Sequence, residues 1–88
     1  MEKSDIRKIL KHPSKELVEI ALGYVNLSEK ERQVIELVEM QGKTEERTAE
    51  MLDISDRNVR YIKDSAFEKI SVVWSYNLFI TLMLKEMA

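Results

Sequence analysis

The sequence predicts an all-α protein, and three observations support this prediction: the composition, the scarcity of turn residues and the capping pattern. Glu, Lys, Leu, Met and Ala, which favour helices, are abundant. The 88 residues include only two glycines and one proline, which is too little turn material for a protein of many strands. Serine or threonine precedes most of the apolar-patterned segments, where helix N-caps are expected.

Length and composition limit the class of protein further. A chain of 88 residues is expected to form a single domain, residues 1–88, that is only marginally stable as a monomer, and dimerisation is a common remedy. The absence of cysteine rules out disulfides and thiolate metal sites and fits a cytoplasmic location. No basic-then-apolar leader opens the sequence, so no secretory signal is predicted. The net charge of −2 means that nucleic acid would have to bind a local face, because binding by charge alone needs clustered Lys and Arg.

Two N-terminal helices are expected within residues 1–26. The first covers residues 5–11, with Ser4-Asp5 as its cap and His12-Pro13 as its stop, since a residue before proline avoids the α region. The second begins after a cap at Ser14, runs to about Val25 and has a broad apolar face. Basic residues of this segment are a second candidate contact for DNA or RNA polymerase, although an ordinary charged face is the favoured interpretation: Lys3, Arg7, Lys8, Lys11 and Lys15.

Two more helices are expected within residues 27–64, before the segment that carries the function. The stretch "SEKE", Ser28 to Glu31, is a capping box, in which each side chain bonds the other residue's amide. The third helix that follows should end at Gly42 in the left-handed conformation. Thr44 is expected to cap a short fourth helix that ends at about Leu52.

The stretch "TAEMLDISDRNVRYI", Thr48 to Ile62, predicts a helix-turn-helix. In this motif a small residue lets the two helices approach, aliphatic residues flank the turn, and two more on the second helix face inward. Each required position is filled by a suitable residue: Ala49, Leu52, Ile54, Val59 and Ile62. Ser55 is expected to cap the second helix, whose outward face is then free to contact base edges in a DNA groove.

The segments "LSEKERQVIELV" and "TEERTAEMLDISDRNVRYIKDSAFEKI" resemble region 4 of bacterial sigma factors, which reads the minus-35 promoter element. The resemblance covers Leu27 to Ile70, and the chain is similar also to the output domains of LuxR-type regulators. Asp53 stands where many helix-turn-helix proteins have glycine, and sigma region 4 sequences often carry Asp there, which favours the sigma-like interpretation. The family usually shows more basic charge at the start of the second helix than this chain does.

The candidate DNA-binding residues fall into two groups. Arg57, Asn58, Arg60 and Tyr61 are expected to contact base edges or nearby phosphates, because Arg pairs with guanine and Asn with adenine through two hydrogen bonds. Thr44, Arg47, Ser55 and Lys63 are better placed for phosphates, where a helix N-terminus also helps. The alternative is that all of them belong to the solvated face of a helical bundle.

Residues 65–88 predict a long C-terminal helix that serves for dimerisation. Nothing after Gly42 forces the fifth helix to stop, so it either runs for about 30 residues or bends near residues 71–75. The apolar run from Ile70 to Leu84 is shorter than the roughly 20 residues of a membrane span and contains polar residues, so no membrane insertion is expected. A heptad rhythm predicts a two-helix contact with a core asparagine that fixes register, at Ala66, Ile70, Val73, Asn77, Ile80, Leu84 and Met87. Another apolar face is offered by Trp74, Leu78, Phe79 and Leu82, so a dimer contact and packing within the chain can both hold. The candidate dimer interface comprises Ile70, Val73, Trp74, Asn77, Ile80 and Leu84. Asn77→Asp should then weaken assembly by burying charge, unless the helix packs within its own chain on residues 14–25.

The function predicted from these features is that of a bacterial or phage transcription regulator that reads promoter DNA, with the helix at residues 55–63, as a homodimer. Its partners would be double-stranded DNA, a second copy and, in some modes of action, RNA polymerase. The first alternative is a module that binds RNA polymerase or a sigma factor and modifies promoter choice without reading DNA, which the acidic residues 16–42 favour. Another alternative is a packaging protein such as a phage terminase small subunit. No catalytic set, cofactor site or metal site is predicted, since His12 stands alone and no phosphate-binding glycine loop occurs.

Overall fold

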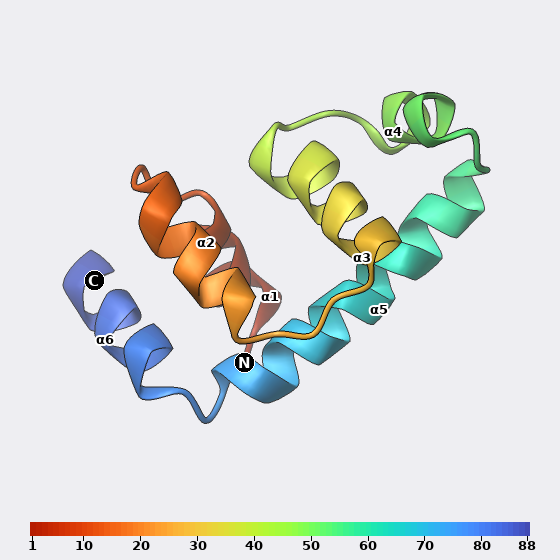
Figure 1. Cartoon of the computed structure of the whole chain (residues 1–88). Coiled ribbons are helices and arrows are strands. Elements are labelled where there is room, and N and C mark those ends of the chain that lie inside the picture. The colour runs from red at the N-terminus through yellow and green to blue at the C-terminus, as the bar shows by residue number, and fades with distance from the viewer. The chain divides into compact units, whose positions relative to one another are not determined.

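The computed structural model describes residues 1–88, and it contains helices joined by turns and no strand, which confirms the all-α prediction (Figure 1). The elements in chain order are α1 (Lys3–Leu10), α2 (Lys15–Gly23), α3 (Glu29–Val34), the π-helix η1 (Ile35–Met40), α4 (Glu45–Leu52), α5 (Asp56–Trp74) and α6 (Leu78–Met87). None of these helices combines the length and hydrophobicity that a membrane-spanning helix needs.

The chain divides into two compact units. Unit 1 comprises Met1–Asn26 together with Phe67–Ala88, and unit 2 comprises Leu27–Ala66. Helix α5 belongs to both units, since it supplies its residues up to Ala66 to unit 2 and its residues from Phe67 to unit 1. That residues 1–88 fold as a single domain stays a prediction.

The first helix differs from its predicted bounds at both ends, since it covers Lys3–Leu10 and not 5–11, and the second differs at its end. Helix α1 begins at Lys3 and not at residue 5, because the amides of Asp5 and Ile6 both bond the carbonyl of Glu2, and Glu2 makes no side-chain cap bond. The prediction that Ser4-Asp5 caps this helix is therefore wrong. Helix α2 has the predicted cap, as Ser14 Oγ accepts a bond from the Leu17 amide at 3.4 Å, but it ends at Gly23 and not at Val25.

Unit 1 has an apolar core to which all four of its helices contribute. Its buried apolar side chains are Ile6, Ile9, Leu10, Val18, Ala21, Leu22, Val25, Phe67, Ile70, Trp74, Ile80 and Met83. The Trp74 indole, which is fully buried, donates a hydrogen bond from Nε1 to the carbonyl oxygen of Ala21 at 2.9 Å. This bond satisfies the polar atom of Trp74 and joins α5 to α2. Lys3 and Arg7 of α1 lie over the ring of Phe67, at 5.7 and 5.3 Å from its centroid.

The predicted long C-terminal helix is broken in the structure, near the place where a bend was one of the two alternatives. Helix α5 ends at Trp74 and α6 begins at Leu78. Asn77 lies in extended conformation and caps the new helix, as its Oδ1 accepts from the Ile80 amide at 3.2 Å. This local bond offers the backbone an alternative to the helical pattern. Ser75 Oγ also donates to the Ser71 carbonyl at 2.6 Å, but the Ser75 amide keeps its helical bond to that carbonyl at 3.1 Å.

The break also corrects the heptad interpretation of the tail. Asn77 is the N-cap of α6 in extended conformation, so it cannot serve as the core asparagine of one continuous helical seam. Ile70, Trp74 and Ile80 are 0% exposed within a single chain, so a partner could not reach their side chains without opening the fold. Val73 and Leu84 are half-buried. The predicted seam therefore belongs largely to the intramolecular core, as the alternative of packing within the chain proposed.

Unit 2 opens with a helix whose start was predicted correctly. Ser28 Oγ accepts from the Glu31 amide at 3.2 Å and the Glu31 carboxylate accepts from the Ser28 amide at 2.8 Å, which completes the capping box. The helix then widens into the π-helix η1, which the sequence did not indicate. Gly42 follows with a φ of +73°, the left-handed conformation that glycine adopts without a steric penalty.

Candidate nucleic-acid interface

Helices α4 and α5 of unit 2 are joined by a tight turn whose shape follows from two residues (Figure 1). Asp53 ends α4 in the left-handed conformation, with φ 56° and ψ 48°, so it takes the role that glycine has in many such turns. The amide of Ile54 then bonds the carbonyl of Ala49 at 3.0 Å, which closes the end of α4. The sharp change of direction lets α5 leave α4 at once, as a helix-turn-helix requires.

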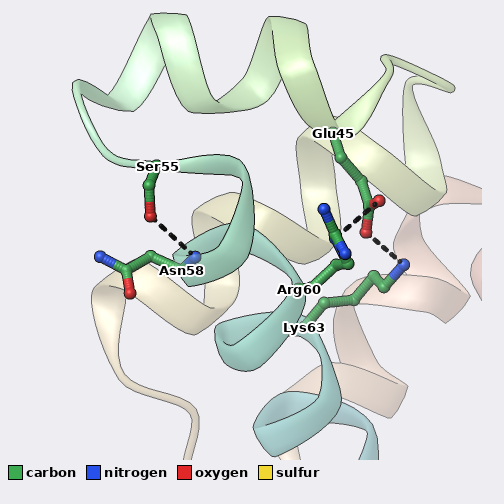
Figure 2. Close-up of polar contacts among 5 residues, drawn as sticks. All are labelled: Glu45, Ser55, Asn58, Arg60 and Lys63. Carbon is green, nitrogen blue, oxygen red and sulfur yellow. Dashed lines mark hydrogen bonds and ion pairs between the residues drawn. The ribbon is translucent and has the colours of Figure 1, made fainter.

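Both helices have the caps that the sequence predicts. Thr44 Oγ1 accepts from the Arg47 amide at 3.0 Å at the start of α4. Ser55 Oγ accepts from the Asn58 amide at 3.1 Å at the start of α5, as Figure 2 shows. These bonds satisfy amides that the first helical turn leaves without partners, and they fix where each helix begins.

A small apolar cluster holds the two helices against α3 and η1. Val34, Ala49 and Val59 are buried at its centre, and four partly buried side chains pack against them: Val38, Leu52, Ile54 and Ile62. The small side chain of Ala49 leaves room for α5, and Val59 and Ile62 direct one face of α5 inward. The inward positions predicted for the helix-turn-helix are thus confirmed.

Because Val59 and Ile62 face the cluster, the side chains between them face solvent. Arg57, Asn58, Arg60 and Tyr61 are all exposed, and Tyr61 has 76% of its surface accessible. One turn and a half of α5 therefore presents two cations, one carboxamide and one aromatic ring on a single free face, which is a chemically suitable set for base edges and phosphates.

Glu45, at the first turn of α4, binds two of the basic residues of α5 (Figure 2). Its Oε2 lies 3.0 Å from Lys63 Nζ and its Oε1 lies 3.5 Å from Arg60 Nε. The Lys63 side chain is only 18% exposed, whereas that of Arg60 is 62% exposed. Lys63 is consequently held by an acid at a largely covered position, while Arg60 keeps most of its surface in solvent.

This role of Glu45 could not be predicted from the sequence. The Glu45–Lys63 contact joins residues 18 positions apart on two different helices, so no helical spacing within one element could indicate it. The structure also pairs Arg47 with Glu50 at 3.3 Å, and this i,i+3 spacing is visible in the sequence. Both side chains of the Arg47–Glu50 pair are well exposed.

The remaining candidates for phosphate contacts lie at helix starts. Thr44 and Ser55 are exposed, and each hydroxyl oxygen already accepts one cap bond. A hydroxyl keeps its own hydrogen for donation when its oxygen accepts, so the caps do not prevent a contact with a phosphate. The candidate dimer residues belong to unit 1. No group of three or more His, Cys, Asp or Glu side chains lies close enough together to hold a metal ion.

A helix, a left-handed turn and a second helix with a free basic and polar face together define the helix-turn-helix class of DNA-binding modules. The family described as sigma-70, region 4, matches residues 25–71, and since this is more than half of the chain, the protein belongs to that family. The family consists of helix-turn-helix modules that bind DNA and RNA polymerase. The resemblance predicted for Leu27 to Ile70 is thereby confirmed, while the similarity to LuxR-type domains stays a prediction. No curated protein and no solved structure matches the chain.

Proposed function

We propose that this protein is a transcription regulator of a bacterium or phage that acts in the cytoplasm, as a homodimer, by reading promoter DNA with the helix from Ser55 to Lys63. One observation carries the proposal: Arg57, Asn58, Arg60 and Tyr61 are exposed together on α5, directly after its cap and within the region that matches the family. The recognition helix of a helix-turn-helix contacts base edges with residues near its N-terminus, and these four are such residues.

The proposed roles follow from the chemistry of the side chains. Arg57 and Asn58 precede Val59 at the beginning of α5. The two donors of the Arg57 guanidinium suit guanine in the major groove, and the donor and acceptor of the Asn58 amide suit adenine. Arg60 and Tyr61 lie one turn further along, where a base edge or a phosphate could be contacted. Thr44, Arg47, Ser55 and Lys63 would bind phosphates and fix the register of the protein on the duplex.

A dimer would offset the weak electrostatic attraction of each copy for DNA. Residues 43–63 carry five basic and five acidic side chains, so one recognition surface has little net attraction for DNA. Two linked recognition helices raise the effective affinity without any new contact, provided that both can engage at once. The operator is then expected to be a pseudo-palindrome with half-sites one helical turn, or a multiple of it, apart.

The proposal is tested by selecting bound sequences from a random DNA pool and then measuring the affinity of the enriched site. Arg57→Ala and Arg60→Ala should each weaken specific binding about tenfold or more, because a bidentate base contact contributes ~1–3 kcal/mol. Lys30→Ala is the matched control, since it removes the same charge from an exposed residue of α3. Enrichment of no sequence even at low salt, or equal losses in all three variants, would contradict the proposed reading of DNA by α5.

The competing function is that of a module that binds RNA polymerase or a sigma factor and changes promoter choice without reading DNA. The observation that favours it is Glu45, which already neutralises part of the basic surface of α5. Under this function, tagged protein should retain polymerase from a bacterial lysate, while no promoter fragment binds the purified chain. Retention of polymerase that is lost with Arg57→Ala, in the absence of any DNA binding, would favour this alternative.

A further inference from the structure

Most of the exposed apolar surface of the protein lies in unit 1. Six of its large hydrophobic side chains are exposed, against two in unit 2, and four of the six belong to α2 and α6 or adjoin them: Ile20, Tyr24, Leu78 and Leu82. Their exposed fractions are 47%, 48%, 73% and 51%, respectively. Single exposed apolar residues are ordinary on a protein surface, but a contiguous group of them usually marks a binding site.

These side chains are linked through one contact between the two segments. The ring of Tyr24, directly after α2, contacts the ring of Phe79 in α6, with centroids 6.0 Å apart. Ile20 and Tyr24 are four residues apart and so share one face of α2 and its end, as Leu78 and Leu82 share one face of α6. Phe79 is three residues from Leu82 and joins the two rows. We call these five residues the α2–α6 strip: Ile20, Tyr24, Leu78, Phe79 and Leu82.

We propose that a second copy of this chain covers the α2–α6 strip, so that the strip is the interface of the homodimer on which the proposed function depends. The area supports this occupant. The exposed fractions correspond to roughly 400–500 Å² per chain, and a standard interface buries about 800 Å² per partner, of which a little over half is apolar. The strip thus supplies the apolar share that one interface of ordinary size requires.

The chemistry of the strip also suits contact with its own copy. In a two-fold symmetric dimer each residue meets the same patch on the partner, so a patch rich in one sign of charge would repel itself. The five residues of the strip carry no charge, and two of them are aromatic, the residue type that is enriched at the centres of interfaces. Such a patch is complementary to itself without any adjustment of charge.

This interface differs from the heptad seam that the sequence predicts. Three candidate interface residues from the sequence, Ile70, Trp74 and Ile80, fill the core of unit 1 and stay there in the proposed dimer. On α6, the strip uses positions 78, 79 and 82, whereas the core uses Ile80 and Met83. One helix can therefore serve both surfaces, because its two faces are separately apolar.

Sedimentation equilibrium of the full chain tests the proposal with two strip variants and one control. Leu82→Glu and Leu78→Glu should each raise the dimer dissociation constant at least about tenfold, because both place a charge in a surface that association removes from water. Met51→Glu is the control, since Met51 of α4 is 46% exposed and lies in unit 2. It should dimerise as the unmodified protein does.

Circular dichroism shows whether each variant is folded. Leu78→Glu keeps the test decisive even if Leu82→Glu unfolds, because position 78 is the first residue of α6, where an acidic side chain favours the helix. A monomeric unmodified protein at high micromolar concentration overturns the proposal, and so does unchanged dimerisation of folded Leu78→Glu. Loss of dimer in the Met51→Glu control also overturns it, because assembly then depends on a surface of unit 2 and not on the strip alone.

The outcome for DNA is separate from the outcome for assembly. If the strip is the interface, Leu78→Glu should still bind a single half-site as the unmodified protein does, but lose the gain in affinity from a paired site. Failure of every form to bind DNA would contradict the proposed function while leaving the sedimentation result, and hence the interface, intact.

Discussion

Glu45 limits how much positive charge α5 can offer to DNA. Its carboxylate binds both Lys63 and Arg60, and all three side chains keep some contact with solvent. A phosphate that approaches Lys63 or Arg60 must compete with this acid, and it is also repelled by it. Glu45 is not a candidate DNA contact itself, but it is therefore expected to lower the affinity for DNA.

Glu45→Gln is expected to strengthen DNA binding a few-fold, because the carboxylate repels phosphate and its ion pair with the exposed Arg60 contributes only ~0.2–1 kcal/mol. The gain should shrink at high salt, where charge interactions are screened. Fluorescence anisotropy with a labelled operator measures both effects. The matched control is Glu46→Gln, which changes the net charge equally at an exposed neighbouring position in the same helical turn. Equal gains for the two variants would show that net charge matters and the Glu45 contacts do not.

Thr48 raises a different question at the residue scale, because its buried hydroxyl oxygen has no hydrogen-bond partner in the protein. Thr48→Val has nearly the same shape and removes the unpaired group, so the free energy of unfolding should stay unchanged or rise by up to about 1 kcal/mol. Thr44→Val, which removes a hydroxyl that caps α4, should instead cost about 1 kcal/mol. Urea unfolding distinguishes the two, and a clear loss for Thr48→Val would mean that its hydroxyl is satisfied.

Residues whose bonds are local were predictable from the sequence. Ser14, Ser28, Thr44 and Ser55 cap helices as expected, because a cap bonds an amide only three residues away. Glu45 was not predictable in its role, since its partners lie on another helix. The candidate contacts on the outward face of α5 were identified by exclusion, because Val59 and Ile62 had to face inward.

At the scale of elements, the end of α5 is the point where sequence reasoning was least informative. The residues from Ile70 onward are apolar and offer neither glycine nor proline, so the helix had no visible stop. The break coincides with the cap bond of Asn77, which competes with the helical pattern. Asparagine carries this signal only weakly, because it is also tolerated inside helices.

Substitutions of Asn77 test whether its cap bond stabilises the start of α6 after the break. Asn77→Ala should lower the free energy of unfolding by about 1 kcal/mol, because the Ile80 amide loses its cap. Asn77→Asp should be nearly neutral or slightly stabilising, since aspartate caps equally well and suits the positive end of a helix. Denaturant unfolding of both variants gives the comparison. The expectation that Asn77→Asp weakens assembly no longer holds, and a large loss of dimer in this variant would reinstate a core position for Asn77.

At the scale of the whole molecule, acidity and DNA binding are compatible because the charges are unevenly distributed. The net charge is −2, yet Arg57 and Arg60 stand on the exposed face of α5 close to the start of that helix. Binding through few basic residues should make affinity modest and the use of two copies important. The proposed operator, the proposed dimer and the sequence of α5 are thus consistent with one another.

The two compact units share α5, and this continuity predicts that the chain unfolds in a single transition. Residues 56–66 of the helix belong to unit 2 and residues 67–74 to unit 1, so neither unit can lose its part without exposing helix ends in the other. Trp74 is the only tryptophan and is fully buried in unit 1, so its fluorescence reports on that unit alone, whereas circular dichroism reports on all helices. Coincident thermal transitions by the two probes are expected, as two-state behaviour requires. A Trp74 transition that precedes or follows the loss of helix would instead mean that the two units unfold independently and that residues 1–88 are not a single domain.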